Sequence, residues 1–92
     1  MNVGEKYWES ELTLNGQPMD ADRKRRATAA QASMDAWGEF HDLSEREQQN
    51  AEAVACEWIV LSVDDHGNID EAESTGGYIP MSQCGEAIVN YS

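Results

Sequence analysis

Positively charged residues are scarce in this chain: six Lys and Arg stand against eighteen Asp and Glu, and the formal net charge is -12. No stretch approaches the roughly 18–20 consecutive apolar residues of a membrane helix. The first ten residues lack the basic and apolar regions of a secretory leader, so we expect a soluble, cytoplasmic protein. In that compartment the only two cysteines, Cys56 and Cys84, are expected to be reduced thiols.

Sequence signatures of catalysis are also missing. The chain has no G-x-S-x-G motif, no glycine-rich phosphate loop and no dinucleotide fingerprint. Its two histidines, His41 and His66, stand in no recognisable motif, and we interpret them as surface residues. The histidines and cysteines are too scattered for the short paired spacings of structural zinc sites. The acidic stretch after Val63 lacks the alternation of a calcium loop, so we expect no enzyme, no metal and no cofactor.

Length and composition predict one domain covering residues 1–92. A chain of 92 residues that is 40% hydrophobic can fold around one modest core. Much of this apolar content is alanine, so the core is thin, and a second copy of the chain in a homodimer could add burial.

The first half of the chain is predicted to form a strand and a helix. Residues 7–14 alternate with period two, which indicates a half-buried strand, and the turn signal Asn15-Gly16 follows it. A helix is predicted from about residue 22 to residue 40, with Asp20 or Asp22 as its N-cap. Its buried stripe would consist of Ala27, Ala30, Met34 and Trp37.

A second helix is predicted to begin at Ser44, because Ser44 and Glu47 have the spacing of a capping box. Its buried stripe would consist of Ala51, Val54, Ala55 and Trp58. We prefer a strand from about residue 58, a hairpin turn over 64–68, and short strands near 68–74, 77–81 and 86–92. The order β-α-α-β-β-(β)-β predicts an α+β fold with two amphipathic helices on one face of a small, mainly antiparallel sheet.

The acidic charge is unevenly distributed along the sequence. Residues 1–26 hold five acids and five bases, whereas residues 27–92 hold thirteen acids and Arg46 alone. Duplex DNA carries one charge per ~1.7 Å, so twelve charges correspond to about 20 Å of duplex. We therefore expect a non-enzymatic inhibitor or nucleic-acid mimic that occupies the basic nucleic-acid-binding site of a larger protein. The partner-binding residues would be Glu45, Glu52, Asp64, Asp65, Asp70, Glu71 and Glu73.

The acidity is also compatible with functions that involve no mimicry. Solubility or adaptation to high salt would give the same composition. The alternative function is that of an antitoxin, an immunity-like protein or an assembly subunit, which would bind through an apolar patch around Trp8, Trp37 or Trp58. Direct binding to nucleic acid is not expected, because the acids would repel a polyanion.

In composition, size and lack of catalytic motifs, the chain resembles the small acidic inhibitors that bacteriophages use against host restriction or CRISPR machinery. The resemblance is to a class without an aligned motif, so it implies an inhibitory function and, for a phage protein, the host cytoplasm. It assigns no residues.

The tetrabasic run at residues 23–26 contains four of the six cations. On the predicted helix, Arg23 and Arg26 extend the apolar stripe, whereas Lys24 and Arg25 point elsewhere. We predict that Arg23 and Arg26 pair with acids of the protein's own body or of a second subunit. The remaining surface would then be almost purely negative.

Overall fold

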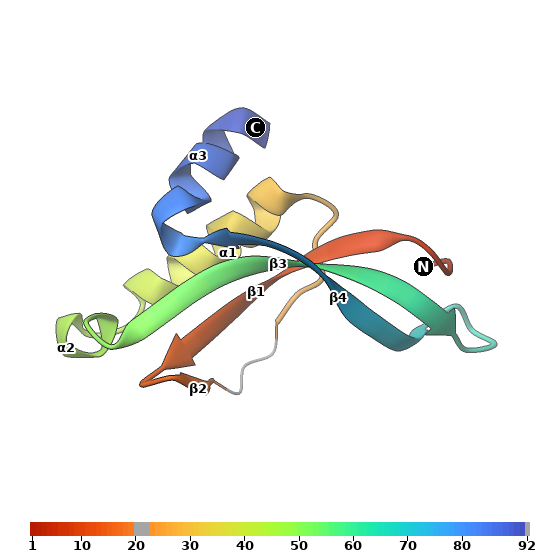
Figure 1. The fold of residues 1–92 in the computed structure, drawn as a ribbon, viewed down its shortest axis with the longest axis horizontal. Helices are drawn as coiled ribbons and strands as arrows, with labels where there is room; N and C mark the ends of the chain where they lie inside the picture. The colour runs from red at the N-terminus through yellow and green to blue at the C-terminus, as the bar shows by residue number, and fades with distance from the viewer. Residues whose placement is uncertain (20–22, 92) are drawn as a thin grey trace.

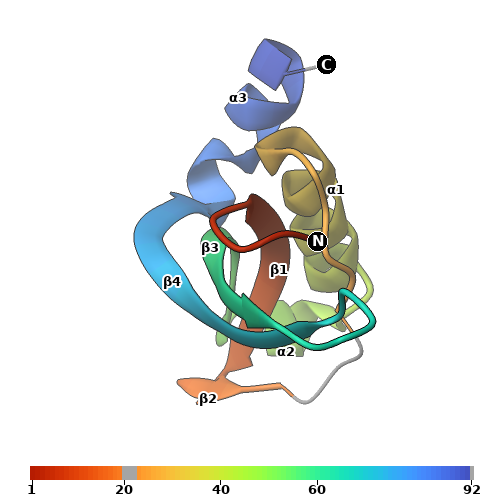
Figure 2. The same cartoon turned by 90° about the vertical axis from the view of Figure 1, so that its right-hand side faces the viewer.

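The computed structural model describes residues 1–19 and 23–91 as an α+β fold (Figure 1). One curled antiparallel sheet has the strand order β2-β1-β3-β4. Its strands are β1 (Lys6–Leu14), β2 (Gln17–Pro18), β3 (Ala51–Val63) and β4 (Ile69–Pro80). The helices are α1 (Ala29–His41), α2 (Glu45–Gln48) and α3 (Met81–Tyr91). Figure 2 shows α1 lying against one side of the sheet and α3 extending past its end.

Two tight turns join neighbouring strands, and the sequence predicted both. Asn15 and Gly16 have φ values of 55° and 79°, as a two-residue β-hairpin requires, and they connect β1 to β2. Residues 64–68 connect β3 to β4, with Gly67 at φ 79°. The predicted strand at residues 7–14 is confirmed as β1, because local alternation and turn chemistry agree there.

Small side chains let α1 approach the sheet closely. The central cluster consists of Leu12 from β1, Ala53 from β3, Ala36 from α1 and Cys84 from α3. Ala36 and Ala53 are fully buried, so no space remains beside them for added methylene groups. The close contact between helix and sheet therefore depends on alanine at these positions.

The predicted first helix was wrong in its start and in its buried face. The helix begins after Thr28, whose side chain accepts a hydrogen bond from the Gln31 backbone N–H, so the basic run precedes the helix. The two candidate caps at residues 20 and 22 lie outside the described residues. Of the predicted stripe only Ala30 is buried, whereas Ala27, Met34 and Trp37 are exposed. The other buried residues of α1 are Ala29, Ala32, Ser33 and Ala36.

The predicted second helix was also wrong beyond its first turn. The capping box between Ser44 and Glu47 is present, but α2 ends at Gln48, and residues 51–63 form β3. The tail expected as a strand at 86–92 belongs to α3 up to Tyr91. The α+β class and the antiparallel sheet are confirmed, whereas two amphipathic helices packed on one face are not.

Replacing Ala36 with leucine tests the close contact between α1 and the sheet. We expect Ala36→Leu to lower the free energy of unfolding by about 1–3 kcal/mol, because the added methylenes overpack a filled space. Urea denaturation measures the change. Gln31→Leu adds an apolar side chain to an exposed position of the same helix and serves as the control. Equal stability of the two variants would contradict the close contact.

Candidate functional site

The seven acids predicted to bind a partner divide into two groups. Glu45 lies in α2, and Glu52 follows at the start of β3. The other five lie in the β3–β4 turn and on β4, and we call them the hairpin acids: Asp64, Asp65, Asp70, Glu71 and Glu73. Figure 1 places α2 and this turn at opposite ends of a molecule 45 Å long. All seven are exposed, but they do not form one compact site.

Asp64 differs from the other hairpin acids because its carboxylate holds the turn. Its Oδ1 accepts hydrogen bonds from the backbone N–H groups of His66 and Asn68, both at 2.9 Å. These bonds, the one from Asn68 first, lower the pKa of the Asp64 carboxyl. Asp64 therefore stabilises the hairpin tip, and Asp65, Asp70, Glu71 and Glu73 are the members available for contact.

Two arginines of the basic run pair with acids of the protein's own body, as the sequence predicted. Arg26 Nε and Nη2 donate to the two carboxylate oxygens of Asp35 at 2.7 and 3.0 Å. This bidentate bond raises the pKa of Arg26 further. Arg23 Nε lies 3.9 Å from Glu39 Oε2, and Arg23 also donates to the backbone oxygens of Met19 and Leu12. Both acid partners belong to α1.

The other two cations of the run remain near the surface. The Arg25 guanidinium lies 5.6 Å from the centre of the Tyr7 ring, which is a cation–π distance. Lys24 is exposed and lines an open groove of about 310 Å³ between the basic run and α1. The Asp35 and Glu39 carboxylates line the same groove, so the groove has cations and anions in its wall.

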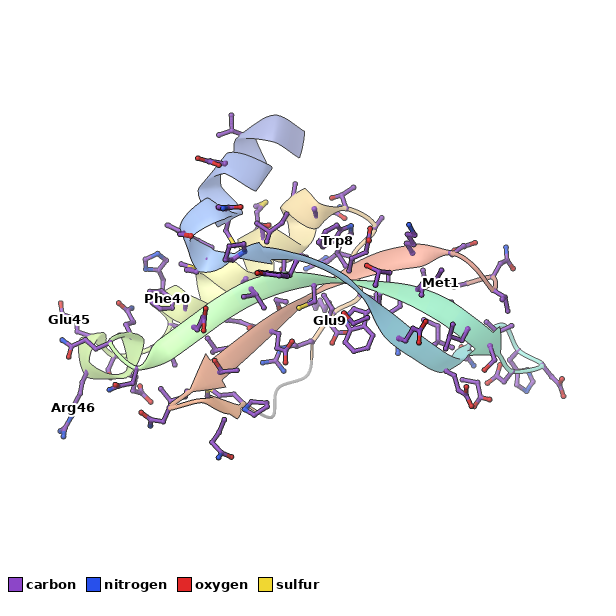
Figure 3. The ribbon with its side chains drawn as sticks, viewed as in Figure 1. Met1, Trp8, Glu9, Phe40, Glu45 and Arg46 are labelled. Carbon is purple, nitrogen blue, oxygen red and sulfur yellow. The ribbon has the colours of Figure 1, made fainter. Side chains whose placement is uncertain are left out.

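A carboxylate–thiol cluster that the sequence did not predict lies on the face of the sheet turned away from α1. Figure 3 shows Trp8 and Glu9 pointing to opposite sides of β1. Glu9 stands opposite Cys56 in the β1–β3 register, and Cys56 Sγ donates to Glu11 Oε2 at 3.4 Å. Burial and then this hydrogen bond raise the pKa of the Cys56 thiol to about 11, and burial raises the pKa of Glu9.

The sequence indicated the two carboxylates of this cluster but not the thiol. Alternation along residues 7–14 placed Glu9 and Glu11 on one side of the strand. Because the sequence predicted a helix from Ser44 that includes residues 51–58, the pairing of Cys56 with β1 was not predicted. Since a protonated thiol is a poor nucleophile, the cluster offers an unreactive cysteine at neutral pH.

The three tryptophans differ in exposure. Trp8 and Trp58 are half-buried, whereas Trp37 is 43% exposed and Met34, on the same side of α1, is 59% exposed. The His41 ring meets the ring of Trp37 edge-on, with a centroid separation of 4.8 Å. The outer side of α1 therefore presents an aromatic and apolar surface.

The two histidines are far apart. His41 ends α1 near α2, and His66 lies in the β3–β4 turn at the other end of the molecule (Figure 1). Over residues 1–19 and 23–91, no group of three or more His, Cys, Asp or Glu side chains could hold a metal ion. Both cysteines are free thiols.

The chain matches no protein-family model, no curated protein and no solved structure. Its function therefore has to be argued from its own residues.

A search of the described part of the chain for a helix that could span a membrane finds none with the necessary length and apolar character.

Alkylation of Cys56 tests the geometry of the carboxylate–thiol cluster. With a thiol pKa of about 11, modification by iodoacetamide should be slow at pH 8 and should rise about tenfold per pH unit until the thiol titrates. Glu11→Gln removes the carboxylate that disfavours the thiolate, so it should lower the pKa and accelerate the reaction at pH 8.

Peptide mapping by mass spectrometry separates Cys56 from the buried Cys84. Glu5→Gln, at an exposed position, is the control. A rate at pH 8 typical of an unperturbed cysteine would contradict the burial of Cys56, and equal rates for Glu11→Gln and the unchanged protein would contradict the hydrogen bond to Glu11.

Proposed function

We propose that the protein is a non-catalytic acidic binding protein that occupies the basic nucleic-acid-binding site of a larger protein. The observation that carries this proposal is the excess of exposed carboxylates over cations, of which Arg23 and Arg26 pair with Glu39 and Asp35 of α1. Exposed carboxylates extend from α2 to the β3–β4 turn, and most of them form no ion pair within the described residues. A surface of this kind attracts basic partners over long range.

The length of the molecule indicates whether the acids would imitate one nucleic-acid strand or a duplex. Twelve net charges along 45 Å give about 3.8 Å per charge, close to the 3.4 Å spacing of phosphates along one DNA strand. Duplex DNA, at ~1.7 Å per charge, is about twice as dense. The mean charge density along the long axis is therefore closer to that of a single phosphate backbone than to that of a duplex, and we propose the single strand as the structure imitated.

The hairpin acids are the part of this surface best suited to direct contact. Asp64 fixes the turn, so Asp65 is presented on an ordered tip, and Glu71 and Glu73 follow on a hydrogen-bonded strand. Charges held in place lose little conformational entropy on binding. We propose Asp65, Asp70, Glu71 and Glu73 as the main contacts, with Glu45 and Glu52 at the far end of the same partner surface.

We place the complex in the cytoplasm, and in the host cytoplasm for a phage-encoded chain. The free thiols of Cys56 and Cys84 support a reducing compartment.

Charge reversal in the hairpin tests this function. The immobilised protein should retain a nucleic-acid-binding protein from an extract of the source organism, and a single-stranded oligonucleotide should release it more readily than a duplex. Asp65→Lys/Glu71→Lys should weaken binding by about tenfold or more at low salt, and less at high salt, because it replaces attraction with repulsion.

Asp42→Lys/Glu86→Lys makes the same charge change at two exposed acids outside the hairpin and is the matched control. Equal loss in both variants would assign the effect to net charge. Retained protein that no oligonucleotide releases would reject the mimic function.

A second candidate function uses the aromatic surface of α1. The exposure of Trp37 and Met34 favours a protein partner, as in an antitoxin or assembly subunit, because aromatic anchors dominate such interfaces.

Truncation of Trp37 distinguishes this candidate from the first. If the aromatic surface binds the partner, Trp37→Ala should weaken the complex by roughly 30-fold, and the complex should persist at high salt. Gln31→Ala, at an exposed position of the same helix, is the control. A complex that dissociates at high salt and ignores Trp37→Ala would instead favour the acidic surface.

A further inference from the structure

The two edges of the sheet differ in whether they are covered. The outer edge of β1 is closed by β2, by the Met19 N–H donating to the Leu12 oxygen at 2.9 Å, and by the two backbone bonds between Trp8 and Arg26. The outer edge of β4 is the opposite end of the sheet, and no strand of residues 1–19 or 23–91 pairs with it. Figure 2 shows β4 as the outermost ribbon on its side.

The free edge of β4 is best ordered between its irregularities. Residues 72–74 pair in regular register with Val60, Ile59 and Trp58 of β3. Along an antiparallel strand, the backbone groups that do not bond inward point outward. Beyond Ser74 the strand bulges, and the Gly76 and Gly77 N–H groups bond to the side chains of Ser74 and Thr75. The available edge therefore covers residues 69–74, in which residues 72–74 are in regular register and two register shifts fall between residues 69 and 72.

Carboxylates flank this edge. Glu71 and Glu73 are exposed, and they are two residues apart, so they leave the strand on the same face. Neither forms an ion pair with any residue that the structure describes. Asp70 adds a third exposed carboxylate at the neighbouring register shift.

These charges disfavour a second copy of the chain that pairs in antiparallel register about Ala72, which lies between Glu71 and Glu73 on this edge. Antiparallel pairing of two β4 edges centred on Ala72 would place Glu71 of each copy opposite Glu73 of the other. Like charges directly opposite each other on paired strands are destabilising. A strand with cations at these positions would instead gain two favourable cross-strand pairs.

We propose that residues 69–74 of β4 bind an extended segment of another protein that carries Lys or Arg at alternate positions and adds to the sheet as a fifth strand. Backbone hydrogen bonds would provide affinity, and the pairing of cations with Glu71 and Glu73 would set the register. This inference rests on the proposed function, because it names the element through which the basic partner is recognised.

Binding of synthetic peptides to the intact protein tests strand addition. The first probe is an eight-residue peptide of alternating Lys and Thr with blocked ends. The second has the same sequence but carries N-methyl groups on alternate backbone nitrogens along its ladder-forming edge, so it keeps the charge and loses the N–H donors. We expect the second to bind about tenfold more weakly, and the first to slow hydrogen exchange within residues 69–74.

Paired variants test the contribution of charge. Glu71→Gln/Glu73→Gln should weaken binding of the unmodified peptide about tenfold at low salt, whereas Asp42→Asn/Glu86→Gln, with the same charge change elsewhere, should leave its affinity within about twofold.

Each contrary result overturns strand addition. Equal binding of the two peptides would reduce the interaction to charge attraction, and no binding of the unmodified peptide would reject the site. Neither result would change whether an oligonucleotide releases the retained partner from the immobilised protein. The proposed function and this inference can therefore fail separately.

Discussion

Arg26 links the basic run to β1 through its backbone and to α1 through its side chain. Its backbone forms two hydrogen bonds with the backbone of Trp8, at 2.7 and 2.8 Å, and its guanidinium donates two more to the Asp35 carboxylate. Arg26 thereby covers the part of the β1 edge at Trp8 and links it to α1. This pairing of Asp35 is compatible with the burial of Ala32 and Ala36 against the sheet and with the exposure of Met34 and Trp37.

The alanine core and the ion pairs depend on each other. A helix packed through alanines approaches the sheet closely, which brings Glu39 within 3.0 Å of the Ser10 hydroxyl and close to Arg23. Placing charged groups beside the core costs desolvation, and pairing offsets that cost. The two pairs take up two cations and two acids together. The acidity of the remaining surface therefore follows from the composition, and the packing decides which acids stay unpaired.

Local interactions were predictable from the sequence, whereas ambiguous alanine patterns were not. The Asn15-Gly16 turn, the capping box at Ser44 and the hairpin turn at 64–68 each depend on a few neighbouring residues. The sequence of residues 51–58 fits the 3.6-residue period of a helix as well as the two-residue period of a strand, because alanine is acceptable on a face of either. Pairing with β1 decides for the strand. The turn that carries the hairpin acids was predictable from its neighbouring residues, whereas the pairing of Cys56 with its carboxylates required the long-range register.

The contrast between the two sheet edges gives the acidity of β4 a structural meaning. An uncovered strand edge normally invites pairing between copies, and charged residues are a common defence. Glu71 and Glu73 oppose self-pairing at the free edge, while the basic run closes the other edge. The same two carboxylates that keep copies apart would favour a cationic strand. Under the proposed function, solubility and partner selection would use one feature of β4, which is why composition alone could not separate them.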